Sequence, residues 1–279
     1  MKKLLVLAIL LISVIASGCG DKFAKEKEAI TKSEQAAMAM KLPEVIVPRS
    51  IEKPTREDWD KYQKNFKELI ETETKMLAEM KKSDAKIAEM EKTASESEKK
   101  DLKAFKDKIQ KARIEFVKKI SKGRLSGDTF VVGVGSTWQE IEMVYGKPLK
   151  TGKDGTGFKE YFYDGLTFSD WIGKGAPPPE IIKKWVSTKV QALTVTSDNY
   201  VSDAGVKIGM TKDEFYKTLR SKYVKKNKWQ KEELYVSQGK GGAETFDVVM
   251  GFSMQDTLPY NLFPNFKDGK LVRYSVSPH

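Results

Sequence analysis

The C-terminal half of the chain is organised by Val134-Gly135-Ser136-Thr137-Trp138-Gln139-Glu140-Ile141, which returns as Ile208-Gly209-Met210-Thr211-Lys212-Asp213-Glu214-Phe215. Gly, Thr and Glu recur at identical offsets, and Val132 matches Val206 upstream. Each copy is typical of a helix start, in which the Thr side chain accepts a bond from a free N–H of the first turn and the Glu reaches back. Two such copies with matching apolar flanks predict an internal duplication.

The segments after each helix start predict an α+β fold. In the first repeat, residues 126–202, a helix over 137–145 ends at Gly146-Lys147-Pro148. Strands over 158–163, 166–172 and 189–195 follow, with Asp164-Gly165 as a hairpin turn and an insertion at 173–185. The second repeat, residues 203–279, has a helix over 211–223 and strands over 233–237, 244–252 and 270–276. We expect two small antiparallel sheets joined edge to edge with helices on one face.

The repeats resemble a known family of binding modules. The helix start and the Gly-x-Pro after it resemble the β-lactamase-inhibitor-like repeat, and are similar to small SmpA/OmlA-like lipoproteins that assemble outer membranes. The likeness covers Val132 to His279, and the second copy departs from it because Arg220 and Lys222 replace Gly146 and Pro148. The resemblance implies a binding surface on the open sheet and its loops.

The N-terminus predicts export. Lys2 and Lys3 precede an apolar run over residues 4–15, which is too short to span a bilayer and is typical of a signal peptide, residues 1–18. The sequence Ala16-Ser17-Gly18-Cys19 resembles the lipobox of bacterial lipoproteins, although the family usually has Leu where Ala16 stands. This resemblance implies that Cys19 carries acyl chains such as palmitate and anchors the chain, outside the cytoplasm, to the cell membrane or outer membrane. The alternative is ordinary cleavage after Gly18, which leaves a free thiol.

A long helical region separates the N-terminus from the repeats. Residues 19–54 are interpreted as a tether with a short spacing helix and a Pro-containing linker. Residues 55–122 carry apolar residues three, four or seven apart from Trp59 to Met90, and the phase slips before Leu102. Ser95 and Glu98 offer a capping box in that gap. We predict an antiparallel helical hairpin or coiled coil, which leaves self-association open, with one long helix that skips a residue as the alternative.

Composition argues against several classes of function. The net charge is +11, but residues 21–124 hold 27 basic against 21 acidic side chains, so the charge is spread and no nucleic-acid surface is predicted. The only His is His279 and the only Cys is Cys19, so we predict no catalytic pair, no metal site, no cofactor and no internal disulfide. A carboxylate-based enzyme acting on envelope polymers is kept as the alternative function.

Aromatic residues give the best candidate site. The strand over 158–163 carries rings on both faces, and one face must cover the core. We predict that Tyr161 and Tyr163, beside Trp171, are exposed and bind a partner, because amphipathic rings are favoured interface anchors. The expected function is therefore an anchored, non-enzymatic binding or scaffold lipoprotein of the cell envelope with an unknown envelope protein as its partner.

Overall fold

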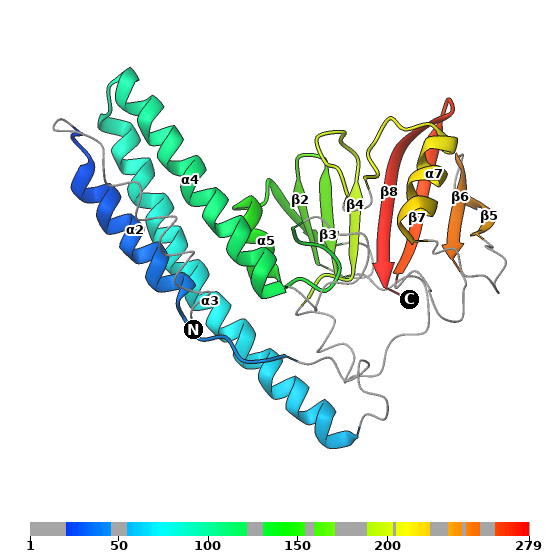
Figure 1. Ribbon diagram of the computed structural model, residues 1–279, viewed down its shortest axis with the longest axis horizontal. Helices are drawn as coiled ribbons and strands as arrows, with labels where there is room; N and C mark the ends of the chain where they lie inside the picture. The colour runs from blue at the N-terminus through cyan, green and yellow to red at the C-terminus, as the bar shows by residue number, and fades with distance from the viewer. Residues whose placement is uncertain are drawn as a thin grey trace. The chain divides into compact units, whose positions relative to one another are not determined.

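The computed structural model describes residues 21–45, 55–121, 131–153, 159–170, 189–202, 205–223, 234–241, 244–251 and 260–278. These residues form an α+β protein with helices in the N-terminal part and an antiparallel sheet in the C-terminal part, as the sequence predicts (Figure 1). The chain divides into a helical unit, Met1–Ile120 with Gln139–Val144, and a sheet unit, Ser121–Trp138 with Tyr145–His279. Within the described ranges, the apolar stretches of the helices are too short or too charged to cross a bilayer.

The predicted helical hairpin is confirmed. Helix α3 (Arg56–Thr93) and helix α4 (Glu96–Ser121) are separated by two residues. Thr55 closes a capping box with Asp58 at the start of α3. At the start of α4 the backbone N–H of Ser95 donates to Glu98 over 2.7 Å. The buried face of α3 follows the predicted seam, whose members are Tyr62, Phe66, Leu69, Glu73, Met76, Met80, Ser83, Ile87 and Met90.

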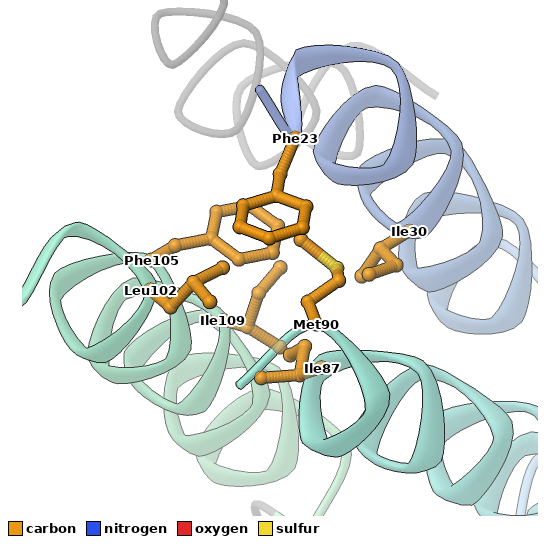
Figure 2. Close-up of a cluster of buried hydrophobic side chains, with 7 residues drawn as sticks. All are labelled: Phe23, Ile30, Ile87, Met90, Leu102, Phe105 and Ile109. Carbon is orange, nitrogen blue, oxygen red and sulfur yellow. The ribbon is translucent and has the colours of Figure 1, made fainter. Parts of the chain in front are cut away.

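Helix α2 (Ala24–Met38) is a third member of this bundle, which corrects the purely spacing role expected for it. Phe23, which precedes the helix, and Ile30 within it join a buried cluster with side chains of α3 and α4. Figure 2 shows the Phe23 ring beside Phe105, with the other members converging from all three helices. The other cluster members are Ile87, Met90, Leu102 and Ile109.

A buried ionic network also ties the three helices together. The Arg113 guanidinium of α4 binds both oxygens of Glu34 in α2, at 2.6 and 2.9 Å, and reaches Asp84 of α3 at 3.0 Å. Glu34 is fully buried and Arg113 is 4% exposed. Burial lowers the pKa of Arg113, but hydrogen bonds and charge from Glu34, followed by those from Asp84, raise it above its ordinary value. A shift of one helix against the others would break this pair and leave a lone buried charge, which is costly. The pair therefore opposes such a shift.

Helix α5 (Trp138–Tyr145) contributes its middle residues to the helical unit. Gln139 donates to the Thr74 hydroxyl at 3.1 Å, and Lys81 pairs with Glu142 at 2.6 Å. Gln110 of α4 donates to the carbonyl of Met143 at 3.2 Å, near the end of α5. A side-chain amide thus satisfies a carbonyl that the helix itself leaves open.

The sheet unit holds one eight-stranded antiparallel sheet in the order β1-β2-β3-β4-β8-β7-β6-β5. Its first half is β1 (Lys150–Lys153), β2 (Lys159–Tyr163), β3 (Leu166–Ser169) and β4 (Ala192–Val195). Its second half is β5 (Leu234–Gly241), β6 (Glu244–Gly251), β7 (Tyr260–Lys267) and β8 (Lys270–Pro278), preceded by helix α7 (Lys212–Tyr223). The two predicted small sheets are therefore joined edge to edge, through β4 and β8, into a single sheet.

Two strands were not predicted, and their sequences explain why. Strand β1 reads Lys-Thr-Gly-Lys and has no apolar alternation to mark it. Strand β7 contains Pro264, and a Pro within an apolar run argues against a strand. The recorded pairing of β7 with β6 is Val249 with Leu262, so among the described residues Pro264 lies outside that ladder.

The two helix starts make the same backbone bonds. Gly135 N–H donates to Val190 at 2.9 Å and Val190 N–H to Ser136 at 2.8 Å. In the second copy, Gly209 donates to Leu271 at 2.8 Å and Leu271 to Met210 at 2.7 Å. Thr137 bridges to Lys189 in the same way as Thr211 bridges to Lys270. Both glycines have positive φ, 97° and 91°, a conformation that disfavours a side chain.

This correspondence continues into the joint between the halves. Thr194 and Ser275 each lie five residues beyond the matching Lys189 and Lys270. They are direct partners across β4 and β8, with their hydroxyl oxygens 2.8 Å apart. The two halves of the sheet therefore meet at equivalent residues of β4 and β8. Counted inward from either edge of the sheet, the four strands of each half follow one another in chain order.

Candidate functional site

The face of β2 that carries Tyr161 and Tyr163 is the face covered by α5. Tyr161 is only 7% exposed, and its ring centre lies 4.5 Å from that of Trp138, the first residue of α5. The Lys159 ammonium lies 4.4 Å from the centre of the Tyr161 ring and 4.8 Å from that of Trp138. The prediction that Tyr161 is an exposed contact is therefore wrong. Its ring belongs to the packing between helix and sheet, where the lysine covers it.

Tyr163 lies in a partly open cluster of tyrosines. Its hydroxyl donates to the Gly146 carbonyl at 3.0 Å, where α5 has ended. Its ring centre lies 5.4 Å from that of Tyr145 and 5.8 Å from that of Phe168. Tyr200 meets Tyr145 edge-on at 6.2 Å. Tyr163 keeps part of its surface exposed, so it remains a candidate contact.

The hydroxyl groups of Tyr145 and Tyr200 stay protonated. Burial raises the pKa of the Tyr145 phenol well above its ordinary value, and the nearby Tyr200 adds to the shift. Burial also raises the pKa of Tyr200, with a further contribution from the Asp164 charge. The Tyr200 hydroxyl donates to the Asp164 carbonyl at 2.9 Å. These phenols are therefore neutral hydrogen-bonding groups at neutral pH, with no tendency to act as nucleophiles.

Two exposed aliphatic side chains adjoin the cluster. Leu149 is 78% exposed, and its backbone N–H donates to Phe162, the neighbour of Tyr163, at 2.9 Å. Val201 is 53% exposed and directly follows Tyr200. We call Tyr145, Leu149, Tyr163, Tyr200 and Val201 together the tyrosine rim, because Tyr145 contacts both other rings and each aliphatic residue is next to one of these tyrosines in the strand pairing or in the chain. Exposed aliphatic side chains next to tyrosines are typical of protein interfaces.

Sequence reasoning missed most of the tyrosine rim. Of its members only Tyr163 was predicted, because the others lie in turns or at a helix end, where no periodicity marks them. The available signal was Leu149 itself, an isolated Leu after Gly-Lys-Pro in a polar loop. Trp171 and Cys19, the remaining predicted site residues, lie outside the described residues.

The face of the sheet opposite α5 carries small hydroxyl side chains at its centre. The register places Thr167, Thr194 and Ser275 side by side across β3, β4 and β8. Phe162 and Phe263 extend this row on either side, and Phe263 is 37% exposed. Within the described ranges, no group of three or more His, Cys, Asp or Glu side chains is arranged to hold a metal ion. This row provides hydrogen-bonding groups and rings, but no charged pair that could transfer a proton.

Comparisons with known proteins leave the family open. No family model matches the chain, and neither does any curated protein. Among solved structures, a DUF4309 family protein (YjgB) from Bacillus subtilis subsp. subtilis aligns with 61% of this chain and 95% of its own, at 13% identity and a TM-score of 0.29.

Proposed function

We propose that the chain is a non-enzymatic binding or scaffold lipoprotein of the bacterial cell envelope, anchored to a bilayer through acylated Cys19. The observation that carries the binding role is the tyrosine rim. Its exposed Leu149 and Val201 are neighbours of Tyr163 and Tyr200, whose hydroxyls are already hydrogen-bonded within the chain. Because the rings are held in place before a partner arrives, binding would cost little side-chain entropy.

The proposed partner is an envelope protein. Two aliphatic side chains beside neutral tyrosines favour a contact with an apolar centre, which is typical of protein interfaces. Charged residues of both signs flank members of the tyrosine rim in the sequence, with Lys150 next to Leu149 and Asp164 next to Tyr163, so a single sign of charge does not dominate there.

A site-specific cross-link tests the binding surface. A photoreactive amino acid placed at Leu149 in the full-length chain, in the native envelope, should form one discrete adduct with a protein. The matched control is Val272, an aliphatic residue that is 38% exposed in the second half of the sheet. Addition of Val201→Glu should abolish the Leu149 adduct, because the proposal has one partner that contacts both side chains and the new charge would have to be buried at that contact. Identical adducts from Leu149 and Val272 would contradict the proposal.

A separate measurement tests the anchor. Fatty-acid labelling of the expressed chain should place the acyl groups on Cys19 and disappear in Cys19→Ala. Equal labelling of the variant, or a mature chain without acyl mass, contradicts the lipoprotein assignment. Turnover of a glycan or peptide by the purified chain would instead favour the carboxylate-based enzyme.

A further inference from the structure

The chain segment closest to Cys19 is fixed to one end of the helical unit. The Lys22 ammonium donates to the Thr93 carbonyl, the last residue of α3, at 2.8 Å. The Phe23 side chain is 6% exposed and belongs to the cluster that contains Met90 and Phe105 (Figure 2). Residues 22 and 23 therefore lie against the end of the bundle where α3 turns into α4.

Further contacts fix the direction of the chain at this end. The backbone N–H of Phe23 donates to Asp21 at 2.9 Å, and Asp21 pairs with Lys27 at 2.8 Å. Both partners of this pair are mostly buried, with 18% and 14% of their side-chain surface exposed. The pKa of Glu98 in the first turn of α4 is lowered, chiefly by hydrogen bonds from Ser95; the Lys22 charge lowers it slightly further and the Asp21 charge opposes that effect. Through Lys22 on Thr93 and Phe23 in the cluster with Phe105, the start of α2 is attached to both helices of the hairpin.

Covalent geometry then limits how far this end can lie from the anchor. Lys22 is three positions after Cys19, and a fully extended chain spans at most about 3.6 Å per residue, or about 11 Å here. The opposite end of α3 lies 37 residues from Thr93, which is about 56 Å at 1.5 Å per residue. An anchor at Cys19 therefore keeps this end of the hairpin near a bilayer and places no such limit on the opposite end.

We infer that the α3–α4 turn, residues 93–98, is the membrane-facing end of the helical unit and that its partner is the headgroup layer of a lipid bilayer. The inference rests on the proposed acylation of Cys19. It adds an orientation, in which α3 and α4 rise from the membrane surface. The far end of α4, at Ser121, would then stand roughly 38 Å along the helix from Glu96.

The side chains of the turn fit a headgroup layer better than a hydrocarbon core. Thr93, Ser95 and Ser97 are exposed and polar. Two lysines at this end are paired, Lys99 with Glu96 at 2.7 Å and Lys92 with Glu89 at 2.6 Å. The exposed large apolar residues of the described chain all lie in the sheet unit or its loops. The turn should therefore rest on zwitterionic headgroups without inserting and without requiring anionic lipid.

Fluorescence quenching on vesicles tests this orientation. The native acylated chain carries a single fluorophore on Ser97→Cys or, as a second position at the same end, on Lys100→Cys. The matched control is Asp60→Cys, an exposed position of α3 roughly 50 Å from Thr93 along the helix. The vesicles are phosphatidylcholine with a nitroxide-labelled headgroup. We expect strong quenching at Ser97 and Lys100 and almost none at Asp60.

The controls separate the orientation from the anchor. A flexible insertion of about ten Gly and Ser residues after Gly20 adds roughly 18 Å of mean reach, so quenching at Ser97 should fall while the chain still sediments with the vesicles. Chain that sediments with vesicles but shows equal quenching at all positions, or more at Asp60, overturns the orientation alone. Chain that sediments no better than Cys19→Ala overturns the proposed anchor, and the orientation with it.

Discussion

The two helix starts of the sheet unit share one backbone arrangement but lie in opposite surroundings. Their glycines have nearly the same positive φ and their flanking bonds differ by 0.1 Å. Yet Thr137 and Glu140 have no exposed surface, whereas Thr211 and Glu214 are exposed. At the exposed copy the capping box is visible, with Thr211 N–H donating to Glu214 at 2.8 Å and Glu214 N–H to Thr211 at 3.3 Å. The corresponding box of Thr137 and Glu140 stays a prediction.

This difference shows that a local motif determines where a helix begins, whereas its surroundings determine how much the motif contributes to stability. The Gly and Thr set the turn and the start of the helix, because those depend on backbone geometry and on bonds within a few residues. The energetic weight of the same side chains depends on burial, since a buried polar group that loses its partner costs more than an exposed one. Substitutions of matched buried and exposed side chains measure that dependence.

The largest loss of stability is expected at a buried carboxylate whose ionic partners are known. Glu34→Ala leaves the Arg113 guanidinium buried without its main counter-ion, so the free energy of unfolding should fall by about 3–5 kcal/mol. The matched control, Glu28→Ala in the same helix, removes an exposed pair with Lys32 and should leave the free energy of unfolding almost unchanged. Chemical denaturation followed by helical circular dichroism measures both. Equal losses of stability in the two variants would show that burial does not determine how much these charges contribute.

The two glycines test whether the backbone is truly the same. Gly135→Ala and Gly209→Ala each force a Cβ into a positive-φ conformation, which should destabilise each helix start by about 1–2 kcal/mol. At Gly209 an added Cβ would meet no atom within 4 Å. The loss of stability in Gly209→Ala therefore measures the strain of the positive φ alone. Hydrogen exchange of peptides from α5 and α7 measures each site. If Gly135→Ala costs clearly less than Gly209→Ala, the two starts are not equivalent.

The smallest effect is the pH dependence of the exposed copy. The pKa of Glu214 is lowered from 4.5, chiefly by the Thr211 backbone N–H and then by the Thr211 hydroxyl. A folded-state pKa below the unfolded value stabilises the fold above about pH 4.5, and this contribution is lost as the pH falls through the lowered pKa. Glu214→Gln should therefore flatten the fall in α7 protection between about pH 6 and pH 3. An unchanged pH profile would contradict this contribution of Glu214.

Features that repeat along one element were predictable from the sequence, and those that join distant elements were not. The α3 seam, including its polar members Glu73 and Ser83, follows from helical spacing alone. Pairing of Glu34 with Arg113 could not be foreseen, because 79 residues separate them and each is common on a solvated helix face. The same limit applies to the packing role of α2.

The candidate site failed at the point where alternation is ambiguous. Strand β2 has rings on both faces. The alternation of side chains tells which residues share a face, but it does not tell which face a helix covers. The deciding contact is Trp138, which covers Tyr161 from 23 residues upstream. Leu149 and Val201 lie in loops, where exposure depends on the surrounding fold and not on a pattern.

The central claim is that one helix start is used in two environments. Its most direct test compares the loss of stability that Thr→Ala causes at each of the two caps. Loss of a cap typically costs about 0.5–2 kcal/mol. Thr137→Ala, with no exposed surface, should reach about 2 kcal/mol, and the exposed Thr211→Ala should stay near 0.5 kcal/mol. Hydrogen exchange of α5 and α7 in the full chain compares the two losses site by site. A loss at Thr137 equal to or smaller than that at Thr211 would contradict the account.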